Sequence, residues 1–213
     1  MKERGMIFNA EMVNAILSGR KMQTRRPIKW KQTRFTEIAE REDGSLWPWA
    51  EDCERGGDIW FACPFGEVGD CIWVRETWAE AGASAPDLKL YRANYPAHVP
   101  THYENVPPAE DVRWTPSIHM PRWASRITLE IIDVRVERLH SISERDALRE
   151  GLFQLPASGR YCLQPGMQYF GMASHSAKEV YSWLWASIYG EESWAANPWV
   201  WVIEFKRVEG GAA

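Results

Sequence analysis

The sequence has no long apolar run. None of its apolar stretches approaches the roughly 20 residues that a helix needs to cross a bilayer. The residues before Glu11 also lack an apolar segment of the length found in a secretory leader. We therefore expect a cytoplasmic protein with no membrane partner.

Cysteine and histidine are too few and too scattered to indicate a metal site. The four cysteines, Cys53, Cys63, Cys71 and Cys162, form neither the closely spaced pairs of a zinc site nor the dense framework of a secreted disulfide protein. A glycine-rich phosphate loop is also missing. The sequence thus predicts no metal and no cofactor.

Acidic residues are missing between Glu11 and Glu37, although the chain of 213 residues carries a formal net charge of -4. A negatively charged protein is not expected to coat nucleic acid, because such binding depends on many phosphate contacts. Positive charge gathered in one stretch can still serve a local site for an anion or a nucleic acid. Seven basic residues carry this charge: Arg20, Lys21, Arg25, Arg26, Lys29, Lys31 and Arg34.

Hydrophobic periodicity predicts a mixed fold. Apolar residues recur at helical spacing over 10–19, and Asn9 is a suitable N-cap for this helix. Capping boxes predict two further helices over 143–151 and 176–190. Runs of strand-forming residues predict strands over 71–78, 125–139 and 198–205. Since no βαβ rhythm is present, we expect the α+β class, as a small mostly antiparallel β-barrel with surrounding helices.

Two long segments, 27–69 and 79–121, look like loops. Proline and glycine recur along both of them. A loop of this length inside a compact domain is usually functional. The sequence therefore predicts two long loop insertions, which either cover a cleft as a lid or extend it as a groove.

The motif Gly19-x-Lys21-x-x-Thr24-x-Arg26 resembles the GxKxxTxR signature of ASCH domains. Three later segments occur in an order similar to that family: Gly69-Asp70 before a strand, a helix that ends at Glu150, and the strand 202–205. The resemblance implies a PUA-like β-barrel, with residues 1–213 as a single ASCH/PUA-like domain and insertions at about 30–68 and 79–121. The segments WVRETW, HMPRWASRI and NPWVWVIEF resemble a prophage-type branch of ASCH proteins.

The motif is also similar to that of the compact bacterial acetylcytidine amidohydrolases, whose lysine, threonine and glutamate correspond to Lys21, Thr24 and Glu150. This resemblance implies a hydrolase that acts on the acyl-amide of a modified cytidine. The chemistry is reasonable, because a threonine nucleophile needs a base, and burial beside guanidinium groups lowers the pKa of a lysine. Glu150, at a helix C-terminus that disfavours an anion, can protonate the leaving nitrogen, and Arg26 can stabilise an oxyanion.

Two other functions fit the same residues. PUA-like barrels commonly bind RNA, so the pocket can instead hold a modified base or a strand without catalysis. A ribonuclease would use Lys21 to stabilise a phosphorane. The partner is in each case a nucleoside or a short RNA or DNA strand. The candidate binding residues are Arg25, Arg26, Arg75, Glu76 and Trp123, of which Glu76 is also compatible with an ion pair across the sheet.

Overall fold

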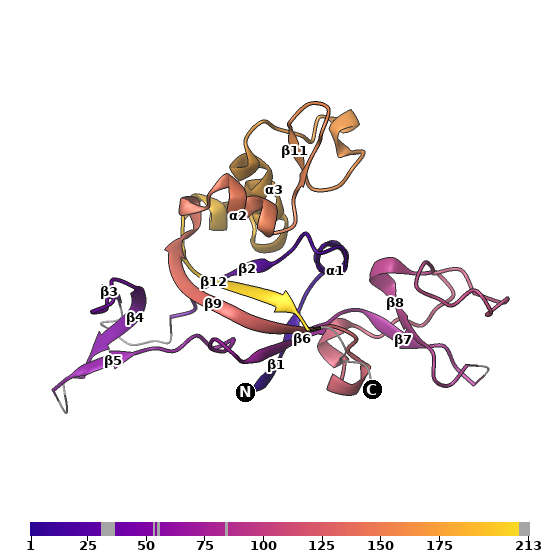
Figure 1. Cartoon of the computed structure of the whole chain (residues 1–213), viewed down its shortest axis with the longest axis horizontal. Helices are drawn as coiled ribbons and strands as arrows, with labels where there is room; N and C mark the ends of the chain where they lie inside the picture. The colour runs from indigo at the N-terminus through magenta and orange to yellow at the C-terminus, as the bar shows by residue number, and fades with distance from the viewer. Residues whose placement is uncertain (31–36, 53, 55, 84, 209–213) are drawn as a thin grey trace.

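The protein has an α+β fold, described here by a computed structural model for residues 1–30, 37–52, 54, 56–83 and 85–208. Within these residues, four α-helices accompany sheets that are mostly antiparallel (Figure 1). The expected α+β class is therefore confirmed.

A five-stranded sheet forms the centre of the fold. Its strands lie in the order β1-β6-β9-β12-β2, and only the β1–β6 pair of this sheet is parallel. β9 and β12 confirm two predicted strands, and β6 confirms the first part of a third. The bounds are β1 Glu3–Ile7, β2 Gln23–Pro27, β6 Cys71–Arg75, β9 Thr128–Arg138 and β12 Trp199–Arg207.

The helices begin where the sequence predicts. The side chains of Asn9, Ser143 and Ser176 each accept a hydrogen bond from a backbone N–H in the first turn of α1, α2 and α3. α2 and α3 pack together on one side of the central sheet (Figure 1). The bounds are α1 Ala10–Leu17, α2 Glu144–Arg149, α3 Ala177–Tyr189 and α4 Glu191–Ala195.

The two expected loop insertions contain regular structure, so their description as loops is wrong. The first holds a three-stranded antiparallel sheet, and the second holds most of a two-stranded one. The proline and glycine content misled the prediction, because strands of three to six residues leave room for frequent turns between them. These strands are β3 Glu37–Glu40, β4 Leu46–Glu51, β5 Asp58–Trp60, β7 Trp78–Glu80 and β8 Lys89–Tyr91.

Short elements complete the described part of the chain. A small hairpin of β10 (Phe153–Gln154) and β11 (Tyr161–Cys162) follows α2. Five 3-10 helices connect the larger elements: η1 Arg92–Asn94, η2 Ser117–His119, η3 Arg122–Ala124, η4 Leu139–Ser141 and η5 Met167–Phe170. Among the described helices, none has both the length and the apolar character required to cross a membrane.

β12 is buried on both of its faces. Trp201 and Ile203 belong to the core that α1 shares, whereas Val200 and Val202 pack with α2 and α3. Because successive side chains of a strand point to opposite faces, this explains the nearly continuous apolar run of its sequence. The two cores on either side of β12 fix α1 and α3 relative to β2, which pairs with β12.

Gly151 lets α1 approach the end of α2. Its φ is +111°, and a Cβ placed there would lie 2.9 Å from the Cβ of Ala15 and 3.4 Å from the Cβ of Lys21. Gly19 also has a positive φ, +73°, but a Cβ there would meet nothing within 4 Å. The two glycines thus share conformational strain, and Gly151 alone adds a steric conflict.

We expect Gly151→Ala to lower the free energy of unfolding by about 2 kcal/mol more than Gly19→Ala does, because a buried clash adds to the cost of the backbone conformation. Urea denaturation of both variants and the wild-type protein measures this difference. Equal losses in the two variants would contradict close packing of Gly151 against Ala15 and Lys21.

Candidate functional site

The basic motif begins directly after α1, as the sequence predicts, and its second half lies on an edge strand that the sequence did not predict. β2 pairs with β12 and is the last strand of the central sheet. Strand geometry places Thr24 and Arg26 on one face and Arg25 on the other. Polar residues such as these give a weak strand signal, so only the pairing with β12 reveals the strand.

Lys21 is buried at the turn before β2. Its side chain has no exposed surface, and its Nζ donates a hydrogen bond to Glu150 Oε2 at 2.7 Å and another to the Glu150 backbone carbonyl at 3.0 Å. Burial is the largest cause of a lowered Lys21 pKa; Glu150 opposes this effect, and Arg26 and Arg25 add to it. The loss of hydration and the two guanidinium groups lower the Lys21 pKa by more than the Glu150 carboxylate, which Arg25 also shares, raises it.

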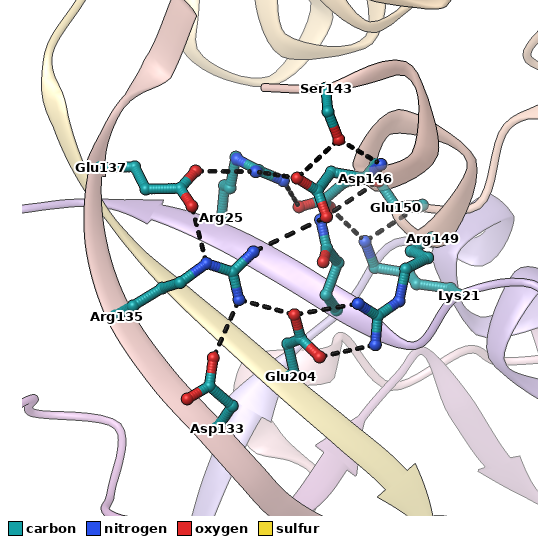
Figure 2. A network of polar contacts seen from close by, with 11 residues as sticks. Lys21, Arg25, Asp133, Arg135, Glu137, Ser143, Asp146, Arg149, Glu150 and Glu204 are labelled. Atoms are coloured by element: carbon teal, nitrogen blue, oxygen red, sulfur yellow. Dashed lines mark hydrogen bonds and ion pairs between the residues drawn. The ribbon is translucent and has the colours of Figure 1, made fainter. Parts of the chain in front are cut away.

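Glu150 joins Lys21 to Arg25. It is the C-cap residue of α2, and its second carboxylate oxygen accepts a hydrogen bond from Arg25 Nη1 at 3.1 Å. Both carboxylate oxygens therefore have a cationic partner (Figure 2). The structure brings Lys21, Arg25 and Glu150 together, as the sequence predicted for the lysine and the glutamate.

Arg25 is occupied by acidic side chains inside the protein. Besides Glu150 it pairs with Glu137 at 3.1 Å and Asp146 at 3.5 Å, and its side chain has no exposed surface. Since a group in this position cannot reach a strand on the surface, Arg25 orients Glu150 and does not form part of an external binding face.

The ion-pair network continues across β9 and β12. Arg135 pairs with Glu137 and Glu204, and Glu204 in turn pairs with Arg149 (Figure 2). Sequence analysis missed these residues. Their signal was the alternation of charges along β9, where Asp133, Arg135 and Glu137 share one face.

Thr24 and Glu150 line one small cavity at the free edge of β2. Its volume of about 10 Å³ is close to the minimum that holds one water molecule. Tyr181 also lines this cavity. Burial raises the pKa of Tyr181 well above its usual value, so this phenol stays neutral. The other lining residues are Met12, Arg25, Arg26, Leu184, Trp185, Ile188 and Tyr189.

The predicted contact between Lys21 and Thr24 is not made in this conformation. Both hydrogen bonds of Lys21 Nζ within the described chain go to Glu150. A proton that leaves Thr24 therefore reaches the Lys21–Glu150 pair only after a small rearrangement or through a water molecule in the cavity.

Arg26 connects the small cavity to a large groove. It lines both, as does Tyr189, and the groove has a volume of about 960 Å³. Arg26 Nη2 donates to the carbonyl of Ile7 at 2.8 Å, while its buried Nε has no partner. Arg75 lines the same groove and donates to the carbonyls of Ser117 and Ile118.

A second cavity, of about 470 Å³, lies on the other side of Glu150. Arg20 lines it and stacks 3.7 Å from the ring centroid of Phe153. Met12, Glu150 and Leu184 border both this cavity and the small one. Glu150 thus borders both the small cavity and this larger one.

Glu76 and Trp123 lie apart from these cavities. Glu76 is buried and forms a two-bond ion pair with Arg126 at 2.9 Å, so the ion-pair interpretation fits it, with Arg126 as its partner. Trp123 is exposed and packs edge-on against Trp78, with ring centroids 5.2 Å apart. Neither residue lines any of the cavities described above.

The predicted basic stretch does not form one continuous surface. Lys21 and Arg25 are buried against acids, and Arg20 faces the 470 Å³ cavity. Lys31 and Arg34 lie outside the described residues. Arg26 and Lys29 remain on the large groove.

No group of three or more histidine, cysteine or acidic side chains that could hold a metal ion occurs in the described part of the chain. Comparison of the sequence and structure with protein-family models, curated proteins and solved structures finds no match in any of the three.

The lowered pKa of Lys21 predicts how stability changes with pH. Between the folded-state pKa and the unfolded value near 10.4, the unfolded chain binds more protons, so the free energy of unfolding rises with pH in this interval. We expect the wild-type protein to gain stability relative to Lys21→Met as the pH rises toward the unfolded-state value near 10.4, because the Lys21 pKa is lowered in the folded protein.

Chemical denaturation at several pH values measures this gain. Lys2→Met, which removes an exposed lysine, is the control and should keep the wild-type pH dependence. Parallel curves for the wild-type protein and Lys21→Met would show that the pKa of Lys21 is not lowered.

Proposed function

We propose that this protein hydrolyses the acyl-amide of a modified, cytidine-like base, as the resemblance to ASCH-type acetylcytidine amidohydrolases predicts. The observation that carries the proposal is the fully buried Lys21–Glu150 pair, 2.7 Å apart, beside the cavity that Thr24 lines. A buried ion pair gives little net stability, and a buried lysine with a lowered pKa, paired with a glutamate that lines a cavity, indicates a functional site. The proposal includes that the α+β fold is a PUA-like β-barrel.

The reaction requires two steps at Thr24. The Thr24 oxygen forms a bond to the acyl carbon, its proton passes to Lys21, which has to be in its uncharged form for this step, and the bond from the acyl carbon to the base nitrogen breaks. The Lys21–Glu150 pair returns the proton to that nitrogen. A water molecule then cleaves the threonine ester and releases the carboxylic acid.

Two neighbouring groups can stabilise the oxyanion of these steps. Arg26 supplies positive charge, and the neutral Tyr181 hydroxyl, which lines the same cavity, supplies a hydrogen-bond donor. Donors in a buried site act more strongly than in water, because the local dielectric is low.

The small cavity must widen before a substrate enters. About 10 Å³ holds no nucleobase, and the C-terminal half of α3 forms its wall through Leu184, Ile188 and Tyr189. The proposal therefore requires that these side chains move when a base approaches from the groove.

The closed cavity also supports a second candidate function, a module that binds a modified base without catalysis. In that case the base stays in the groove beside Arg26 and Tyr189, and the buried pair only maintains the end of β2. Only the enzyme would convert acetylcytidine to cytidine, whereas the binding module would hold the base unchanged.

Incubation with acetylcytidine, followed by chromatography of cytidine, tests the enzyme. We expect release of cytidine by the wild-type protein, and a loss of at least about 100-fold in Thr24→Val, which removes the nucleophile and keeps the shape of the side chain. Lys21→Met should lose activity to the same extent, because Thr24 then has no base.

Thr77→Val is the matched control, because Thr77 lines none of the cavities and should retain full turnover. Full activity in Thr24→Val would exclude this mechanism. Absence of turnover by the wild-type protein, together with a higher melting temperature in the presence of acetylcytidine, would favour the binding module.

A further inference from the structure

The large groove is built mainly by residues that lie outside the Lys21–Thr24–Glu150 site. The start of the first insertion, the segment 60–65 and parts of β1 and β2 line it. Its volume of about 960 Å³ is at the upper end of the roughly 300–1,000 Å³ typical of ligand pockets. One free nucleoside is smaller than this space.

The groove is positively charged in a negatively charged protein. Arg26, Lys29 and Arg75 line it, and no aspartate or glutamate occurs among its described lining residues. None of the three forms an ion pair with a carboxylate of the described residues, in contrast to Arg25 of β2 and Arg135 of β9. The uncompensated charge and the unpartnered Arg26 Nε are suited to an anionic ligand.

Aromatic rings accompany these cations. Trp30, Trp60 and Phe61 line the groove, and the Trp30 side chain is 42% exposed. Arg41 lies 5.0 Å from the ring centroid of Trp60 and adds another cation beside it. Aromatic rings together with cations in one groove are suited to single-stranded nucleic acid, because the bases stack on the rings while the phosphates face the cations.

We propose that the groove holds a single-stranded nucleic acid segment, so that the reactive base is presented within a strand and not as a free nucleoside. This inference rests on the proposed function for the fate of the base, and on the groove alone for the binding of the strand. Arg26 and Tyr189 border both the groove and the small cavity, so a strand in the groove places one base next to Thr24.

Fluorescence anisotropy with labelled cytidine-rich octamers of RNA and DNA tests the binding. We expect saturable binding of single strands at low salt and none of the matching duplex, whose bases are already stacked. With three cations involved, the logarithm of the association constant should fall with the logarithm of the salt concentration with a slope of about -2.

Groove variants separate charge from stacking. Trp30→Ala should weaken strand binding about 10-fold through the loss of one stacked base, with Phe61→Ala as a second stacking variant should the first fail to fold. Lys29→Gln should weaken binding and also reduce the salt slope. The matched controls are Phe170→Ala, another exposed aromatic, and Arg145→Gln, another exposed cation, and both should bind like the wild-type protein.

The outcomes distinguish this inference from the proposed function. Turnover of acetylcytidine without strand binding at low salt would overturn the groove inference and leave the proposed function intact. Strand binding without turnover would support strand binding by the groove and overturn the proposed enzymatic activity.

Equal binding of duplex and single strands, or unchanged binding in both Trp30→Ala and Phe61→Ala, would overturn the stacking arrangement. Binding of RNA alone, of DNA alone or of both supports the inference and identifies the sugar that the groove accepts.

Discussion

The candidate site depends on one interaction, the buried contact of Lys21 with Glu150. Removing two charges from water costs several kcal/mol per ion unless their geometry and their remaining hydrogen bonds are satisfied. Here the Glu150 carboxylate meets Lys21 on one oxygen and Arg25 on the other. This requirement fixes the turn after α1, the end of α2 and the edge strand β2 against one another, because each contributes one of the three side chains.

The structure assigns different tasks to the positive charges of the motif. Lys21 and Arg25 pair with carboxylates inside the protein, whereas Arg26 pairs with no carboxylate of the described residues and lines both the small cavity and the groove. A closed polar cavity strengthens electrostatic interactions, and an open groove retains hydrated charge for a ligand. Arg26 and Tyr189 line both the small cavity and the groove, so the proposed chemistry and the proposed strand binding would use adjoining spaces.

Local signals predicted much of the fold. The starts of α1, α2 and α3 were predictable, since a capping side chain and apolar periodicity lie within a few residues of one another. The long strands β9 and β12 carry enough strand-forming residues to be recognised alone. β2 was not predictable in this way, because its polar sequence forms a strand only through pairing with β12. The short strands β3, β4 and β5 were hidden by the turns between them.

The sequence by itself determined which chemical groups are available: a lysine, a threonine and several arginines in an acid-free stretch, and a glutamate at a helix end. Only the tertiary structure decided which of these charges are paired and buried and which remain free. The physical reason is distance along the chain: Lys21 and Glu150 are separated by 129 residues, and Arg25 and Glu137 by 112. Local patterns carry no record of such partners, because burial and neutralisation arise only when the sheet and its helices pack together.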